Sequence, residues 1–122
     1  MEILGVQPRT APGQLTKTQV DRVCDYVEAH LHQPITLDEL AGVAGLSRSH
    51  FSRSFRSTTG QGPYRFVTSR RIDQACGLLA LGDRLSITAI AQAVGFANAG
   101  VFRRAFHQST GLTPQQFRKE RC

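Results

Sequence analysis

One pattern occurs twice in this chain, and it constrains the fold more than any other feature. Each copy holds two phenylalanines four residues apart with an arginine between them, then a glycine, a proline and a third phenylalanine. The copies are Phe51-x-Arg53-x-Phe55-x4-Gly60-x2-Pro63-x2-Phe66 and Phe102-x-Arg104-x-Phe106-x4-Gly111-x2-Pro114-x2-Phe117. Apolar residues four apart share one face of a helix. Glycine suits a helix end and proline the start of the next helix. The pattern therefore predicts two copies of one helical unit.

The repeat extends towards the N-terminus of each copy. Thr36-Leu37-x2-Leu40-Ala41-x2-Ala44-Gly45-Leu46 aligns with Ser86-Ile87-x2-Ile90-Ala91-x2-Val94-Gly95-Phe96. The second copy has one extra residue between Phe96 and Phe102. A short helix, a glycine turn and a second helix form a helix-turn-helix unit. Internal duplication of such a unit indicates two copies of a recognition element rather than one catalytic site.

Capping signals predict where the helices begin. Thr16 with Gln19, and Thr36 with Glu39, have the spacing of capping boxes, and Ser86 suits the cap of a later helix. No alternating strand pattern competes with the helical periodicity. The predicted fold class is all-α, with seven helices at about residues 16–32, 37–44, 48–59, 63–81, 87–94, 98–110 and 114–120.

These helices imply two helix-turn-helix subdomains bridged by a long central helix. The expected divisions are a flexible leader or linker remnant over residues 1–15, a first subdomain over 16–62, the bridging helix over 63–81 and a second subdomain over 82–122. At about 1.5 Å per residue the bridging helix would be about 28 Å long. It would hold two recognition helices near one DNA turn, about 34 Å, apart.

The basic residues are grouped in a way that favours a polyanionic partner. The formal net charge is +6, and arginine supplies 13 of the 15 basic residues. Residues 47–72 contain six arginines and no acid, and residues 97–119 contain three arginines, one lysine and no acid. Such stretches favour nucleic acid, an anionic membrane or an acidic protein. Arginine favours bidentate contacts with phosphates and guanine.

Other function classes find little support in the sequence. The histidines lack metal-ligand spacing, and no nucleophile motif, carboxylate pair or phosphate-binding glycine loop occurs, so we expect no enzyme, no metal and no cofactor. Cys24 and Cys76 lie in apolar helical series and are expected to be small core residues. The absence of a disulfide framework, a signal peptide or a membrane span predicts a reducing, cytoplasmic location and no membrane partner.

Helical geometry selects the candidate contact residues. With Phe51 and Phe55 facing the core, Arg53 points outward, and Arg104 is its equivalent in the second copy. Each arginine is a candidate for bidentate pairing with guanine, worth about 1–3 kcal/mol of discrimination. The candidate phosphate contacts are Arg48, Arg56 and His107, while Arg103 is a candidate for either role.

The segment Gly95-Phe96-x5-Phe102-x-Arg104-x-Phe106-x4-Gly111-Leu112-Thr113-Pro114-x2-Phe117-Arg118 closely resembles the signature of AraC/XylS-type transcriptional regulators. The first unit, residues 35–66, is similar to the same family, and the resemblance covers roughly residues 16–121. It implies a bacterial domain that binds double-stranded DNA at asymmetric promoter sites. Members commonly activate transcription through contacts with RNA polymerase. Many carry a sensor or dimerisation domain before this one, so the chain is either a stand-alone regulator or the C-terminal piece of a larger one.

The resemblance also implies a set of base-contacting residues. By position these are Ser49, Ser52 and Arg53 in the first unit, and Ala99, Gly100, Val101 and Arg104 in the second, with Arg103 beside them. The run from Ala99 to Val101 departs from the family pattern because it offers no side-chain hydrogen bond. We therefore expect the second unit to depend mainly on its two arginines.

A second interpretation remains open. A helical adaptor that binds an acidic protein through the same basic faces would need neither one-turn spacing nor a preferred DNA sequence. Competition with random duplex separates the two interpretations, because only sequence-specific DNA binding resists it.

Overall fold

Seven helices and no strand make up the part of the chain that the computed structural model describes, residues 13–82 and 84–121. The predicted all-α class is therefore confirmed. The helices are α1 (Lys17–His30), α2 (Leu37–Ala44), α3 (Arg48–Thr59), α4 (Pro63–Leu79), α5 (Ile87–Ala93), α6 (Ala99–Thr110) and α7 (Pro114–Arg121). The predicted leader spans residues 1–15, and its residues 1–12 lie outside the described residues.

The predicted helix caps are present in the structure. The Thr16 side chain accepts the backbone N–H of Gln19, and the Gln19 side chain accepts the N–H of Thr16, at 3.1 and 2.9 Å. Thr36 and Glu39 exchange the same two bonds at the start of α2. Ser86 accepts the N–H of Ala89 at the start of α5. These bonds satisfy N–H groups that the first turn of a helix leaves without partners, which explains why the helices begin there.

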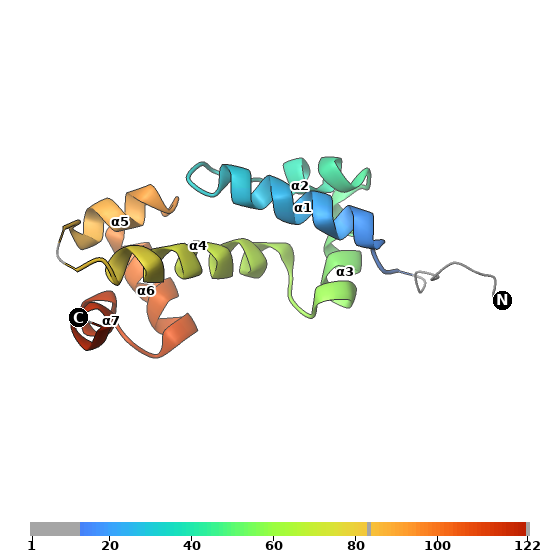
Figure 1. The fold of residues 1–122 in the computed structure, drawn as a ribbon. Helices are drawn as coiled ribbons and strands as arrows, with labels where there is room; N and C mark the ends of the chain where they lie inside the picture. Colours follow the sequence, from blue (N-terminus) through green and yellow to red (C-terminus); the bar gives the residue numbers. More distant parts are fainter. Residues whose placement is uncertain (1–12, 83, 122) are drawn as a thin grey trace.

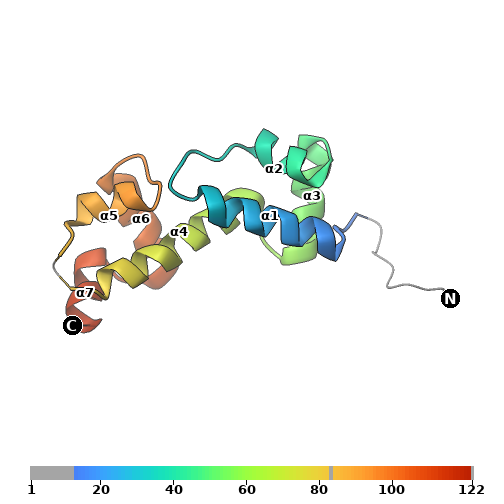
Figure 2. The same ribbon diagram turned by 45° about the horizontal axis from the view of Figure 1, so that its top comes forward.

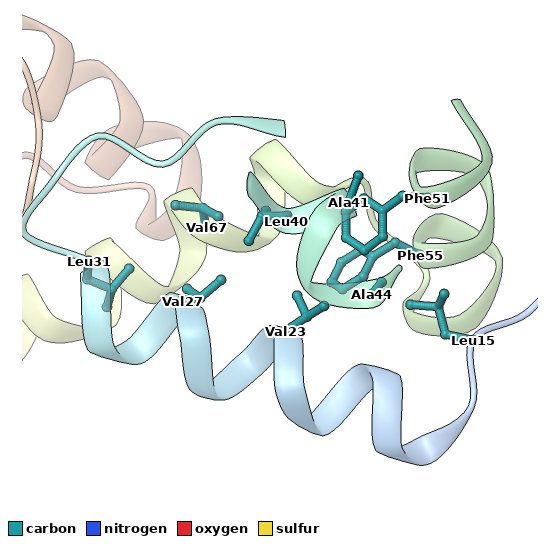
Figure 3. Close-up of a cluster of buried hydrophobic side chains, with 10 residues drawn as sticks. All are labelled: Leu15, Val23, Val27, Leu31, Leu40, Ala41, Ala44, Phe51, Phe55 and Val67. Carbon is teal, nitrogen blue, oxygen red and sulfur yellow. The ribbon is translucent and has the colours of Figure 1, made fainter. Parts of the chain in front are cut away.

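The first hydrophobic core joins α1, α2 and α3 to the first turns of α4. Figure 3 shows Val23, Val27 and Leu31 in a row along α1 and its C-terminal end. Phe51 and Phe55 of α3 lie near Val23 and Leu15, and Val67 of α4 lies towards the Leu31 end. Leu15 precedes α1 and is 5% exposed, and its N–H donates to Thr58 Oγ1 at 2.8 Å. The core contains Leu15, Val23, Val27, Leu31, Leu40, Ala41, Ala44, Phe51, Phe55 and Val67.

The second core repeats this arrangement around the C-terminal half of α4. It contains Ile72, Ala75, Leu79, Ile87, Ile90, Ala91, Val94, Phe96, Phe102 and Phe106. Since Val67 belongs to one core and Ile72, Ala75 and Leu79 to the other, α4 is a structural member of both units.

The bridging helix places α3 and α6 at its opposite ends, as both views show (Figures 1 and 2). Helix α4 has 17 residues, which corresponds to about 25 Å at the usual rise. It is shorter than the predicted 63–81 because the chain leaves the helix at Ala80 and turns at Gly82, whose φ is +92°. The first helix also ends before its predicted limit of residue 32, at His30.

The duplication extends to individual hydrogen bonds. Leu46 N–H donates to Ala41 and Phe96 N–H donates to Ala91, both at 2.9 Å, so the two turns close in the same way. The N-caps of the second helices are Ser47 and Asn98. Leu46 and Phe96 are 50 positions apart in the sequence, whereas the two caps are 51 apart. The extra residue of the second copy therefore lies between Phe96 and Asn98, at Ala97.

The two described thiols differ from each other. Cys76 packs against the second core, as predicted. Cys24 is half-buried like Cys76, but it does not pack against the first core, so its prediction was wrong. The buried stripe of α1 runs through Val23 and Val27, and Cys24 lies about 100° away from Val23 around the helix. Burial, and then Asp21 and two further acids, raise the pKa of the Cys24 thiol.

Candidate nucleic-acid interface

Helix α3 is oriented by its two phenylalanines. Phe51 and Phe55 are fully buried, and their ring centroids lie 5.4 Å apart. Arg53 lies between them in sequence and therefore points to the opposite side, where it is exposed. Ser47 caps the helix by accepting the His50 N–H at 3.2 Å. The core contacts thus fix which face of α3 is presented to solvent.

The first unit gathers four of its predicted contact residues at one groove. A groove of about 600 Å³ is lined by Leu37, Arg48, Ser49, Ser52 and Arg53. Arg48 pairs with Asp38 of α2 at 3.2 Å, but both side chains are largely exposed, at 66% and 72%. An exposed pair of this kind is worth little in free energy, so Arg48 can exchange its carboxylate partner for a phosphate.

The second unit presents a different surface from the same backbone. Arg103, Arg104 and His107 are exposed on α6. Phe102 and Phe106 are fully buried beneath them. The first turn is half-buried instead: Val101 packs against the second core, and Ala99 and Gly100 are only partly exposed.

The Asn98 cap gives Gly100 a structural role that the sequence did not indicate. The Asn98 side chain accepts the Val101 N–H at 2.9 Å. A Cβ at Gly100 would lie 3.3 Å from the Asn98 carbonyl oxygen Oδ1, a tight contact. Gly100 therefore leaves room for the cap, in addition to any contact it makes with a ligand.

A recess between the two recognition helices brings in residues that the sequence did not single out. It measures about 550 Å³ and is lined by the end of α3, the start of α4 and one flank of α6. Tyr64 and Arg65 contribute from α4, and Gln108 from α6. Gln108 follows Arg104 by four residues, so it extends the outward face of α6 into the recess. The signal for Arg65 was its place in the first acid-free stretch.

That stretch divides into two groups of arginines with different surroundings. Arg48, Arg53, Arg56 and Arg65 are exposed along α3 and the start of α4. Arg70 instead pairs with Glu28 of α1 and Asp73 of α4, and the Glu28 bond is the main reason that the pKa of Arg70 is raised. Arg71 donates to two backbone carbonyls. The last two arginines therefore tie the structure together rather than face a ligand.

Within residues 13–82 and 84–121, no group of three His, Cys, Asp or Glu side chains is arranged to hold a metal ion. None of the helices in this part is both long enough and apolar enough to span a membrane.

Comparison with known proteins agrees with this geometry. A family profile described as "Helix-turn-helix domain" matches residues 40–120. An uncharacterized HTH-type transcriptional regulator of Staphylococcus aureus (strain COL) is 37% identical over 124 residues, which cover 99% of this chain and 16% of that protein. The MmsAB operon regulatory protein of Pseudomonas aeruginosa is 31% identical over 92% of this chain and 36% of its own length. The chain thus spans a minor part of these relatives.

Solved structures show the same fold. An AraC-type DNA-binding domain-containing regulator from Chromobacterium violaceum superimposes with a TM-score of 0.79 at 25% identity, covering 87% of this chain and 94% of that one. The DNA-binding domain of AdpA, crystallised with a target DNA, gives a TM-score of 0.77 at 30% identity. The match covers 86% of this chain and 93% of that one. The duplicated units, the arginine-bearing faces and these likenesses lead to one conclusion. The chain belongs to the AraC/XylS-type helix-turn-helix family of DNA-binding transcriptional regulators.

Proposed function

We propose that this chain binds double-stranded DNA sequence-specifically, with α3 and α6 in two successive major grooves of one duplex. The observation that carries the proposal is the pair of equivalent exposed arginines, Arg53 on α3 and Arg104 on α6. These two helices lie at opposite ends of α4 (Figure 1). In helix-turn-helix proteins the second helix of each unit enters the major groove. The complex of AdpA with DNA supports this use of the shared fold.

The proposed roles follow from exposure and position. Arg53, with Ser49 and Ser52, contacts base edges in the first block, because these side chains line one groove on the outward face of α3. In the second block, Arg104 and Arg103 supply the polar contacts, while Ala99, Gly100 and Val101 offer apolar or backbone contacts, such as Val101 with a thymine methyl.

Phosphate contacts hold the two helices in register. Arg48, Arg56 and His107 were expected in this role, and their exposure supports it. We add Arg65, since it lines the recess between α3 and α6 and would face the DNA backbone between the two blocks. Removing Arg65 should weaken binding to all duplexes alike and lower the slope of log affinity against log salt by about 1.

At the level of the whole protein we propose transcriptional control, by activation through contacts with RNA polymerase. The family resemblance supports this role, and a promoter fused to a reporter gene tests its direction. A reporter whose expression rises when the protein is removed would show repression instead. A sensor or dimerisation domain N-terminal to this segment fits the greater length of the relatives.

The decisive experiment selects binding sites from random duplex DNA in the presence of excess competitor. We expect two enriched sequence blocks about one helical turn apart. Arg53→Ala should blur one block and Arg104→Ala the other. Arg22→Ala, an exposed arginine on α1 away from both faces, serves as the matched control and should leave both blocks unchanged.

An absence of any enriched sequence would contradict the proposal. Retained binding to acidic polypeptides under the same conditions would then favour the adaptor interpretation. If one block appears without the other, the chain uses a single unit and the claim of two successive grooves is wrong.

A further inference from the structure

The two units meet at a second place besides α4, which we call the junction. It consists of the Leu31 and Gln33 carbonyls after α1, the Arg71 side chain on α4, and Gly95 in the turn between α5 and α6. The most closely packed pairs of helices otherwise lie within one unit or involve α4. The junction is therefore a separate link that closes a loop of contacts from α1 through α4 to the second turn.

Arg71 is held at the junction by the end of α1. Its Nε donates to the Leu31 carbonyl at 3.1 Å, and its Nη2 donates to the Gln33 carbonyl at 2.8 Å. Leu31 is the C-cap of α1, where helix carbonyls lack helical partners and a cation is favoured. Arg71 is partly buried, and this burial lowers its pKa. The Leu31 side chain meanwhile belongs to the first core (Figure 3).

Gly95 brings the second unit against the same carbonyl. A Cβ built at Gly95 would lie 2.1 Å from the Leu31 oxygen and 2.8 Å from Arg71 Nε, so no side chain fits there. Gly45 occupies the equivalent turn of the first unit with a similar φ of +73°, against +96° for Gly95, yet a Cβ at Gly45 meets nothing within 4 Å. The left-handed turn explains glycine at both positions, but only Gly95 is also required by a contact between units.

We propose that Arg71 and Gly95 are positioning residues that fix the relative orientation of α3 and α6, and thereby the length of DNA between the two sequence blocks. The inference rests on the proposed function, because it concerns how the two units bind one duplex. Each base pair added between the blocks rotates one relative to the other by about 34° and moves it by about 3.4 Å. Units held at two points cannot follow that change, whereas units joined by α4 alone can bend or twist to follow it.

The test measures affinity against spacing. Duplexes carry the selected site with the spacer shortened or lengthened by one and two base pairs, and dissociation constants are measured by fluorescence anisotropy. For the unmodified chain we expect one preferred spacing and a loss of at least about tenfold for one base pair either way, since one unit then loses its base contacts. For Arg71→Met and Gly95→Ala we expect weaker binding at the preferred spacing and less than about a threefold difference between spacings.

Two matched variants separate positioning from general damage. Arg70→Met removes the neighbouring arginine, which pairs with the carboxylates of Glu28 and Asp73. Gly45→Ala introduces the same left-handed strain at a turn with open space. Both should keep the single preferred spacing. Gly95→Ala retains Arg71, so it decides the matter if Arg71→Met does not fold, as judged by circular dichroism.

Folded Arg71→Met and Gly95→Ala proteins that keep the unmodified spacing preference would overturn the inference and leave the proposed function standing. Equal flattening by Gly45→Ala would also overturn it, because turn strain alone would then be sufficient. If the unmodified chain selects no site, the proposed function fails, and this inference fails with it.

Discussion

In the first unit the recognition helix presents a groove of serine and arginine side chains, whereas in the second unit the equivalent helix presents two arginines above a half-buried apolar turn. The backbones of the two turns close with the same hydrogen bonds. The two copies thus share a scaffold and differ in their surface. A duplicated fold has been kept while the chemistry at its outward faces has diverged.

The interiors of the two units differ as well. Ser54 of α3 is 1% exposed, and its hydroxyl has no hydrogen-bond partner among the described residues. Its equivalent in the second unit is Ala105. The rings of Phe96 and Phe102 are in contact, with their centroids 5.3 Å apart. The first unit has Leu46 at the position equivalent to Phe96. The second interior is therefore more apolar and more aromatic, although its outward face offers fewer polar groups.

The largest expected effect concerns the aromatic cores. Phe102→Ala should lower the free energy of unfolding by about 3–5 kcal/mol. Phe51→Ala should cost about 0.5–1.5 kcal/mol less, because Phe51 contacts one ring and Phe102 contacts two. Urea unfolding of each variant measures both values. In a Phe96→Leu background, the losses of stability caused by Phe102→Ala and Phe51→Ala should become nearly equal. A difference that persists there would contradict the explanation.

The next effect concerns base discrimination. Arg53→Ala and Arg104→Ala should each cost about 1–3 kcal/mol of discrimination at one base pair. Arg104→Ala should weaken its block more completely, because Arg103 alone then supplies a polar side chain there, whereas Ser49 and Ser52 both remain beside position 53. Dissociation constants for single-base variants of the selected site measure this asymmetry. Equal loss of the two blocks would show that the serines do not contact bases.

A smaller effect is expected from exchanging the buried serine for the residue of the other copy. Ser54→Ala should raise the free energy of unfolding by about 1 kcal/mol, since a buried hydroxyl without a partner is costly to bury. The reciprocal change, Ala105→Ser, should alter the free energy of unfolding by a smaller amount, because that position is only half-buried. Urea unfolding curves give both values. A loss of stability in Ser54→Ala would indicate that the hydroxyl has a bound partner in solution.

The smallest expected effect is a difference in pH dependence between α2 and α5, the first helices of the two helix-turn-helix units. The Thr36 N–H, and then the Tyr26 hydroxyl, lower the pKa of Glu39 from its ordinary value of 4.5. A lowered folded pKa contributes stability above the unfolded pKa, and that contribution is lost as the pH falls through the folded value. Acidification below pH 4.5 should therefore speed amide exchange in the first turn of α2.

Helix α5 serves as the internal control, because Ala89 stands where α2 has Glu39. Its first-turn amides should show no matching change in protection after correction for intrinsic exchange. Glu39→Gln should keep the capping box and abolish the pH response. A response that survives this substitution would have another cause.

The helices were predictable because their signals are local. A capping bond joins residues three apart, and a buried stripe depends on spacing along one helix, so Thr16, Thr36 and Ser86 indicated the correct starts. The outward position of Arg53 followed from its phenylalanine neighbours for the same reason. Cys24 was assigned wrongly because spacing alone does not fix which edge of an apolar stripe faces the core.

The surroundings of individual arginines were not predictable. All six arginines of residues 47–72 share one acid-free stretch, yet Arg70 finds Glu28 across the fold, and Arg71 finds carbonyls about 40 residues away. Arg65 reaches the recess only because α4 packs between α3 and α6. Net charge in a segment gives the class of partner and leaves open which side chains remain available to it.

The sequence by itself determined seven helices, their duplication and the pair of equivalent arginines, since each depends on periodicity, caps and internal similarity. The tertiary structure alone decided how the two copies differ in use. Gly45 and Gly95 are equivalent in sequence and in backbone conformation, but only Gly95 lies against the Leu31 carbonyl and Arg71. That contact joins residues distant in the chain, and local physical chemistry carries no information about it.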